Sequence, residues 1–233
     1  MDKITTPNNE TFKNMIIIQR MIKLKILIFH LLIGTCIYGQ EDKTIEFDHN
    51  TFALKDSIET GLTINQIINK INVVCSTDTQ KLCLVAGWFF ENIDFDVDKF
   101  NTGGQIGDYE IVFINRKGTC GDYASLFAEF CNRLKIQNEI IEGYVPEYNS
   151  ENKVYYETNH AWNVVKLGEN WFHCDLLGFS GYLKMDKSGE FQFLKQVNTS
   201  NFLIRDSYFL AKHIPADPIW QLSNYPIPLD SLL

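Results

Sequence analysis

The sequence predicts an α+β fold in which a helix that begins at a cysteine packs on an antiparallel sheet that carries a histidine and an aspartate. Three observations predict it. Apolar residues after Cys120 recur with the spacing of one helix face. Two β-type runs, 160–167 and 171–177, flank a turn at Gly168 and predict a hairpin. A further β-type run, 139–145, predicts the first strand of the sheet.

The helix expected from Cys120 has a clear apolar face. Its members are Tyr123, Leu126, Phe127, Phe130, Cys131 and Leu134. Gly118 and Thr119 precede the helix, and no glycine or proline interrupts residues 122–135. A thiol at a helix N-terminus faces free backbone N–H groups and the positive end of the helix dipole, and both favour the thiolate. We therefore predict that Cys120 is a nucleophile, with a buried structural thiol as the alternative.

His160 and Asp175 are expected to meet across the hairpin. His160 lies eight positions before Gly168 and Asp175 lies seven after it, and facing residues have Cβ atoms about 4.5–5.5 Å apart. An imidazole that takes a thiol proton needs a third group to fix its tautomer, and a carboxylate can do this. His160 is the candidate base and Asp175 the candidate orienting acid. The alternatives are a satisfied core histidine and an edge carboxylate.

Two helices are expected before this core. Residues 63–74 and 80–92 both place apolar side chains on helical spacing, and the polar segment 76–79 between them offers N-cap residues. Acidic residues then alternate along 94–98. They lack the glycine and the final glutamate of an EF-hand loop, so we expect a solvated acidic turn rather than a calcium site.

The remaining segments have weaker patterns. Residues 101–107 are glycine-rich but lack the Lys-Ser/Thr pair of a phosphate-binding loop, so they predict a mobile loop, with a lid as the alternative. Residues 109–114 predict a short strand or an apolar approach to the active-site helix. The apolar segments 191–194 and 202–210 are expected to complete the sheet and cap the core. The proline-rich tail, 215–228, is expected to pack as extended chain.

The motifs around the three candidate residues resemble those of the transglutaminase-like cysteine enzymes. They are Cys-Gly-Asp-Tyr-Ala from Cys120, His-Ala-Trp-Asn from His160 and Trp-Phe-His-Cys-Asp ending at Asp175. The branch that looks most similar is the peptidase-like one that includes kyphoscoliosis peptidase. Two further segments are similar to that branch, namely 80–96, where a phenylalanine replaces the usual tyrosine at position 95, and 213–221.

This resemblance implies a papain/transglutaminase-like fold with Cys120, His160 and Asp175 as nucleophile, base and orienting acid, and with no cofactor. Four neighbours are expected to bind substrate or support the site: Gly118, Gly121, Trp162 and Asn163. His173 would share the face of Asp175 on a strand, so it is either a plain strand histidine or a neighbour of the site.

The expected reaction is attack of the Cys120 thiolate on an amide bond of a peptide or protein, through a thioester acyl-enzyme. Hydrolysis is preferred to amine transfer because the sequence has none of the extra β-sandwich domains of the animal cross-linking enzymes. The alternative is a non-catalytic peptide- or cell-wall-binding module on the same fold. An arylamine acyl transferase, which uses the same three residue types, is a further option.

Composition excludes some classes of protein. The length of 233 residues suits one domain with additional segments, and 45% hydrophobic residues are ordinary for a globular chain. The net charge of −8, with no basic patch outside the N-terminus, argues against a nucleic-acid partner. The sequence has no Cys-x-x-Cys or His-x-x-x-His pair, so no metal is expected.

Residues 1–39 are expected to be an N-terminal extension and a secretory signal. Lys23 and Lys25 precede an apolar run over 26–37, and the small residue Gly39 follows it. The run is too short for a comfortable membrane span, so no stable span is expected after signal removal. The protein is therefore expected to be secreted or periplasmic.

The mature chain is expected to contain a linker over 40–58 and a transglutaminase-like domain over 59–233, with its core at 80–183. Five cysteines follow the signal, and an odd number in an exported protein leaves at least one free thiol. A bridge between Cys75 and Cys83 is plausible because they are close in sequence, although sequence does not fix connectivity.

Overall fold

The computed structural model describes residues 61–103, 107–145, 158–205 and 207–231. The expected extension, signal and linker lie outside the described residues, as does the centre of the glycine-rich segment. Among the helices of the described ranges, none has the length and apolar character needed to cross a membrane.

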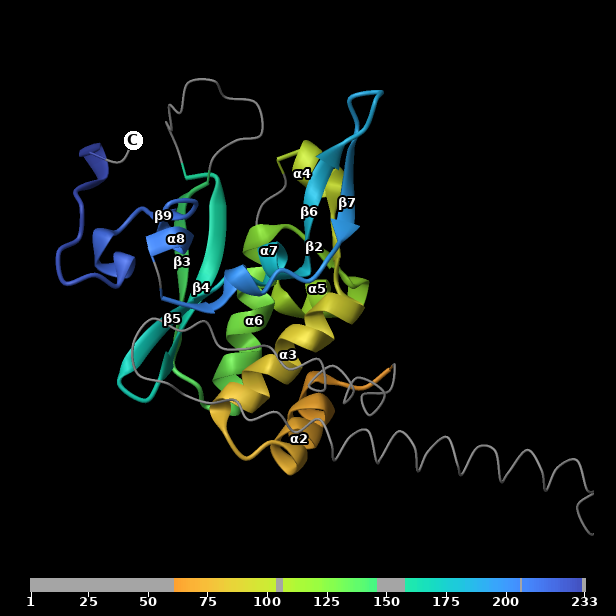
Figure 1. Ribbon diagram of the computed structural model, residues 1–233. Helices are drawn as coiled ribbons and strands as arrows, with labels where there is room; N and C mark the ends of the chain where they lie inside the picture. The colour runs from red at the N-terminus through yellow and green to blue at the C-terminus, as the bar shows by residue number, and fades with distance from the viewer. Residues whose placement is uncertain (1–60, 104–106, 146–157, 206, 232–233) are drawn as a thin grey trace, which may run out of the picture.

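A helical layer packs against one side of an antiparallel sheet (Figure 1). The helices of this layer are α2 (Ile64–Val74), α3 (Asp78–Asn92), α5 (Tyr109–Asn115) and α6 (Cys120–Leu134). The five strands, in spatial order, are β8 (Phe202–Ile204), β5 (Asn170–Cys174), β4 (His160–Leu167), β3 (Asn138–Tyr144) and β9 (Ile214–Pro215). All neighbouring pairs are antiparallel. This arrangement confirms the predicted α+β fold.

The first two helices begin with capping boxes. The polar segment 76–79 predicted the second cap, whereas Thr63, expected inside the first helix, is its N-cap. The Thr63 hydroxyl accepts the N–H of Gln66, whose side chain accepts the N–H of Thr63 in return. Thr77 and Gln80 repeat the arrangement at the start of α3. Such caps satisfy backbone donors that a helix leaves unpaired, and each contributes about 1 kcal/mol.

Helix α6 joins the two layers. Its predicted apolar face is fully buried, and it lies against β4 and β3 of the sheet. Phe130 packs on Trp88 and Phe89 of α3, with ring centroids 5.1 and 5.7 Å away. Full burial of a side chain of this size contributes about 1.5–3 kcal/mol, so α6 is held firmly where it presents Cys120.

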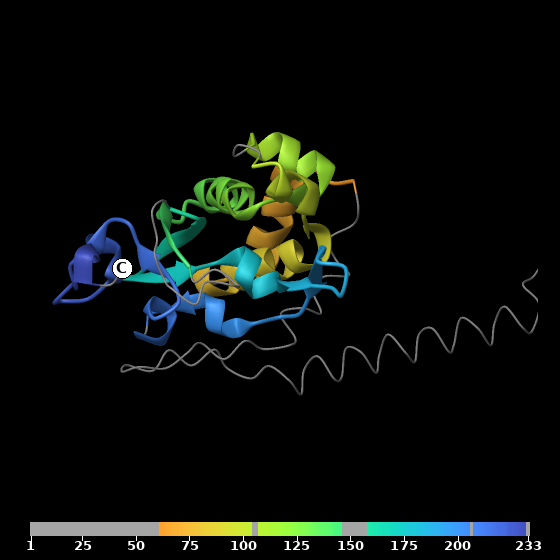
Figure 2. The ribbon, with the colours of Figure 1, turned by 90° about the horizontal axis from the view of Figure 1, so that it is seen from above.

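The sheet separates two apolar cores. The larger core lies between the helices and the sheet, whereas a smaller one gathers Ile141, Trp162, Val164, Ile204 and Phe209. Helices α2, α3, α5 and α6 lie on one side of the strands (Figures 1 and 2). The C-terminal segment, residues 207–231, lies on the other side. The second core is therefore made by the sheet and the C-terminal part of the chain.

One predicted strand is a helix. Residues 109–114 belong to α5, whose N-cap Asp108 accepts the N–H of Glu110 with its carboxylate. A short run such as this one, with five apolar residues among six, does not distinguish a strand from a short helix by periodicity. The cap decides the conformation here, and the second expectation for this segment, an apolar approach to α6, agrees with the packing of α5 on that helix.

The second strand of the hairpin is shorter than predicted. It ends at Cys174 rather than at Leu177, because Asp175 caps the short helix α7 (Leu176–Ser180). The first strand, β4, has the predicted bounds, and β3 begins one residue earlier than expected.

The C-terminal segments complete the fold in ways that sequence did not predict. Strand β7 (Phe191–Lys195) pairs with β6 (Gly181–Met185) in a separate two-stranded sheet instead of extending the main one. Strand β8 does extend the main sheet, beside β5, and β9 adds the opposite edge after helix α8 (Ser207–Leu210). The tail beyond β9 includes 3-10 turns at Pro218–Gln221 and Leu229–Ser231 rather than extended chain alone.

Several short elements lie between the main helices and strands. The elements are β1 (Asp94–Phe95), α4 (Val97–Asn101), β2 (Lys117–Gly118) and the 3-10 turn Thr199–Asn201. Cys75 and Cys83 are both buried and are not joined by a disulfide, so the plausible bridge between them is not formed.

Candidate active site

Cys120 is the first residue of α6 and is half-buried. Its thiol lies close enough to the side chain of His160 and to the backbone of Ala161 for both to lower its pKa. Burial raises the pKa of this thiol, but the hydrogen bond and charge of His160 and the hydrogen bond from Ala161 outweigh burial and the nearby Asp175. The pKa of Cys120 therefore lies below its ordinary value, which favours the nucleophilic thiolate.

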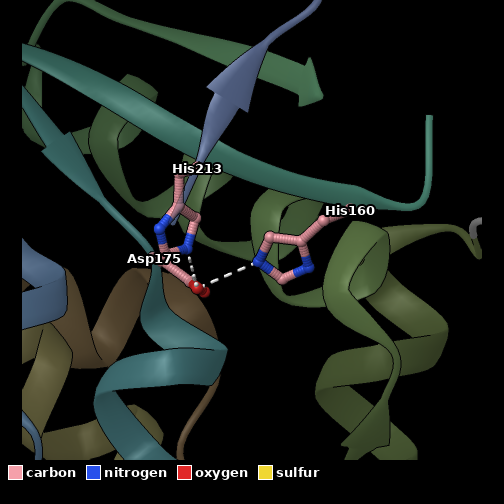
Figure 3. Close-up of side chains that lie close together, drawn as sticks. All are labelled: His160, Asp175 and His213. Carbon is pink, nitrogen blue, oxygen red and sulfur yellow. Dashed lines mark hydrogen bonds and ion pairs between the residues drawn. The ribbon is translucent and has the colours of Figure 1, made fainter. Parts of the chain in front are cut away.

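His160 opens strand β4 and lies between the thiol and a carboxylate. Its Nε2 is 2.9 Å from Oδ2 of Asp175 (Figure 3), which leaves Nδ1 for Cys120. Burial lowers the pKa of His160, but the charge and hydrogen bond of Asp175, together with Cys120, raise it above its ordinary value. A lowered thiol pKa beside a raised imidazole pKa favours a thiolate–imidazolium pair.

Asp175 lies between β5 and α7, and each oxygen of its carboxylate accepts hydrogen bonds. Oδ1 accepts the N–H of Gly178 at 2.9 Å, which caps α7. Oδ2 accepts from His160 at 2.9 Å and from His213 at 3.1 Å (Figure 3). Burial raises the pKa of Asp175, but the charges and hydrogen bonds of the two histidines hold it well below its usual range. The hairpin thus brings His160 and Asp175 together as predicted.

His213 is the site residue that sequence reasoning missed. It lies 38 positions after Asp175. It opens the segment 213–221, which resembles the peptidase-like branch, but the resemblance assigned no role to this histidine. The ligand atoms of His160, Asp175 and His213 lie within 4.8 Å of one another. Two imidazoles and a carboxylate are donors that a small divalent cation could use. In this structure the same atoms hydrogen-bond to one another.

Trp162 and His173 support the site from within the protein. The Trp162 ring stacks on His160 with centroids 5.9 Å apart, and its Nε1–H donates to Nδ1 of His173 at 3.0 Å. Burial and the nearby His213 lower the pKa of His173 to about 3. His173 is therefore a neighbour of the site, and the buried Trp162 ring backs the imidazole of His160.

The other three predicted supporting residues lie on or beside α6. Asn163 donates from Nδ2 to the carbonyl of Ala124 at 3.1 Å, which ties β4 to α6. Gly118 lies in β2, where a Cβ would approach the Cβ of Asp122 to 2.5 Å. Gly121 is buried in the first turn of α6. These positions suit supporting roles. Asn163 and Gly118 both contact residues of α6, namely Ala124 and Asp122.

Asp122 and Lys99 form a second buried contact near the nucleophile. The Asp122 side chain is fully buried and accepts from Lys99 Nζ at 2.6 Å and from the N–H groups of Thr119 and Gly107. Burial raises the pKa of Asp122, but these donors hold it below its ordinary value. The capping pattern Thr-x-x-Asp at 119–122 was the sequence signal for this residue.

We expect Asp122→Asn to lower the free energy of unfolding by about 3 kcal/mol, because it leaves the Lys99 ammonium beside a buried, neutral amide. Urea denaturation at pH 7 measures this. Asp78→Asn is the matched control, since Asp78 pairs with Lys81 on the surface with 52% of its side chain exposed, and such pairs contribute at most about 1 kcal/mol. Equal losses in the two variants would contradict this view of Asp122.

The family model of the transglutaminase-like superfamily matches residues 65–176. No curated protein matches the chain.

Three solved structures are similar in part. A candidate cysteine protease from Cytophaga hutchinsonii has 17% identity and a TM-score of 0.39, over 57% of this chain and 40% of that one. A TGase has 15% identity and a TM-score of 0.36, over 55% and 37%. A candidate protease from Parabacteroides distasonis ATCC 8503 has 13% identity and a TM-score of 0.39, over 64% and 30%. This chain therefore matches 40% or less of the length of each.

Proposed function

Because the chain belongs to the transglutaminase-like superfamily, we propose that it is a cysteine enzyme that acts on amide bonds of peptides or proteins. The nucleophile is Cys120, the base is His160 and the orienting acid is Asp175. The observation that carries this proposal is the hydrogen bond between His160 and Asp175, next to a thiol at the start of α6 whose pKa is lowered by His160.

In the first half of the proposed reaction, the Cys120 thiolate attacks the amide carbonyl carbon, and an S–C bond forms while the carbonyl electrons move to oxygen. The backbone N–H of Cys120, at the start of α6, is the proposed donor to this oxyanion. His160 then gives its Nδ1 proton to the leaving nitrogen, the C–N bond breaks, and a thioester remains.

In the second half, His160 accepts a proton from the incoming group, which attacks the thioester carbonyl and releases the thiolate. We propose water as this group, since hydrolysis needs no second binding site. A primary amine would follow the same path and give transfer instead. Asp175 keeps its negative charge throughout and stabilises the imidazolium that each half of the reaction uses.

Digested casein peptides, incubated with the full chain and analysed by mass spectrometry, test the proposal. We expect new peptide termini or deamidated glutamines without added amine. Both products should be absent with Cys120→Ala. Both should be retained with Cys75→Ala, a matched change at a buried thiol whose pKa is raised rather than lowered.

Two other outcomes would replace the proposal. Products that appear only with an added fluorescent amine, as peptide–amine adducts, would make the protein a transferase. Peptide binding without any product, unchanged by Cys120→Ala, would favour the binding-module alternative.

A further inference from the structure

We propose that His213 is a positioning residue of this site, and that it holds the Asp175 carboxylate in the orientation that orders the His160 imidazole. The inference rests on the proposed function, because it assigns the second partner of the same carboxylate. It deepens that proposal by making the C-terminal segment part of the active site, although this segment lies beyond the residues that the family model matches.

The hydrogen bonds around Asp175 leave its carboxylate no freedom to turn. Oδ1 is held by the N–H of Gly178, and Oδ2 is held by His213 Nε2 at 3.1 Å. A carboxylate accepts hydrogen bonds and does not donate them, so Nε2 of His213 carries the hydrogen. Both oxygens are thus fixed by groups other than His160. His160 Nε2 therefore bonds, at 2.9 Å, to an Oδ2 atom whose position is set by Gly178 and His213.

His213 is itself held rigidly. Its ring stacks on Phe209 with centroids 3.9 Å apart and planes 5° apart, and Trp162 meets it edge-on at 5.3 Å. Its backbone N–H donates to the carbonyl of Phe209 at 2.9 Å. Strand β9 follows at once and pairs with β3, where Gly143 faces Pro215. A Cβ at Gly143 would collide with the Ile214 carbonyl and the Trp162 ring, so glycine permits this close approach.

The polarity of His213 needs an explanation that packing does not give. The ring is buried, and its Nδ1 has no hydrogen-bond partner among the described residues. An unpaired buried nitrogen destabilises a protein, and a phenylalanine would fill a similar space without it. The bond from Nε2 to Asp175 is what distinguishes this histidine from an apolar ring. Its function therefore lies in that bond.

The charges around His213 agree with this role. The titratable groups that face it are His160 from β4, His173 from β5 and Asp175 before α7. Burial raises the pKa of Asp175, and His213 is one of the two groups that lower it. Without His213, a buried carboxylate would keep one imidazole partner instead of two. The Asp175 carboxylate would then stabilise the His160 imidazolium less. A weaker imidazolium would in turn stabilise the Cys120 thiolate less.

Two substitutions separate the hydrogen bond from the packing. His213→Phe keeps a ring that can stack on Phe209 but removes the donor, whereas His213→Gln keeps an N–H donor near the position of Nε2 but removes the ring. The measurement is the rate of Cys120 alkylation by iodoacetamide against pH, followed by mass spectrometry of the peptide that contains Cys120. It needs no substrate, and it reports the thiolate directly.

We expect His213→Phe to move the midpoint of this profile upward by about one pH unit, and His213→Gln to stay close to wild type. All three proteins should converge near pH ~9, where a thiol without a partner is also ionised. A general loss of folding would expose every cysteine and would not give this convergence.

Each outcome decides the proposal. A wild-type alkylation midpoint in the range of an ordinary thiol would contradict the proposed function, and the role of His213 would fall with it. An acidic wild-type midpoint that His213→Phe leaves unchanged would overturn the role of His213 alone. A larger shift in His213→Gln than in His213→Phe would make the histidine a packing residue. If His213→Phe fails to fold, His213→Leu is compared with His213→Gln, since neither keeps the ring.

Discussion

The His160→Ala variant is expected to lose the reactivity of Cys120 at acidic pH. In the wild type, the pKa of Cys120 is lowered and that of His160 is raised, so the thiolate–imidazolium pair dominates between the two values. Without the imidazole, burial and the nearby Asp175 raise the pKa of the thiol and only the backbone of Ala161 opposes them. We therefore expect a pKa at or above the free value of about 8.5. The midpoint of the alkylation profile should therefore move from below the free-thiol value to about pH 8.5 or higher.

The size of the rate change follows from two opposing effects. A free thiol holds roughly one part in 300 as thiolate at pH 6. A thiolate of low pKa is intrinsically less nucleophilic, which offsets part of that advantage. We expect a net loss of at least about tenfold at pH 6 in His160→Ala.

The urea-unfolded chain, alkylated at each pH, provides the reference for a thiol without partners. A folded wild-type profile that coincides with this reference would show that Cys120 and His160 do not share a proton. Hydrolysis should also fall at alkaline pH, as the imidazolium that protonates the leaving amine loses its proton. The pH–activity curve is therefore expected to be bell-shaped.

Asp175→Ala is expected to have the largest effect on stability. It removes the partner of two buried imidazoles and the N-cap of α7. Breaking a buried ion pair costs about 3–5 kcal/mol, and the lost cap adds about 1 kcal/mol. Urea denaturation at pH 7 should show a loss of at least about 3 kcal/mol in the free energy of unfolding. Alkylation of Cys120 should lose its acidic midpoint at the same time.

The matched control is Asp108→Ala, because Asp108 caps α5 through the N–H of Glu110 and has no histidine among its recorded hydrogen-bond partners. We expect it to cost about 1 kcal/mol, as for an ordinary N-cap. If Asp175→Ala costs no more than Asp108→Ala, the two histidines do not depend on this carboxylate for stability.

The pH dependence of the Asp175 contribution has a definite sign. The folded pKa of Asp175 is depressed, so its stabilisation is fully present above the unfolded value of about 3.9. It is lost as pH falls below that value, by about 1.4 kcal/mol per pH unit until the folded pKa is reached. The raised pKa of His160 adds a contribution that grows as pH falls toward about 6. The difference in stability between wild type and Asp175→Ala should therefore be largest near pH 5 and shrink below pH ~4.

Local sequence patterns determined the centre of this fold. The apolar spacing after Cys120 predicts α6, because one helix face repeats along a single continuous segment. The two β-type runs around Gly168 predict the hairpin that brings His160 to Asp175. Both inferences needed only neighbours in sequence, so the start of α6 at Cys120 and the approach of His160 to Asp175 were accessible from the sequence.

Short segments were decided by contacts that such patterns do not contain. Residues 109–114 are a helix because Asp108 caps them, and the hairpin ends early because Asp175 caps α7. Strand β7 pairs with β6 rather than with the main sheet. A short apolar run favours helix and strand almost equally, so one hydrogen bond or one neighbouring strand settles it.

The second histidine on Asp175 was beyond sequence reasoning for a related reason. Nothing in the residues around His213 indicates a partner 38 positions earlier. That contact exists because β9 pairs with β3 at the edge of the sheet, and His213, directly before β9, packs beside Trp162 and Phe209. Sequence determined which residues could do the chemistry. The tertiary structure decided what surrounds them, because contacts between distant segments leave no periodic signal in either one.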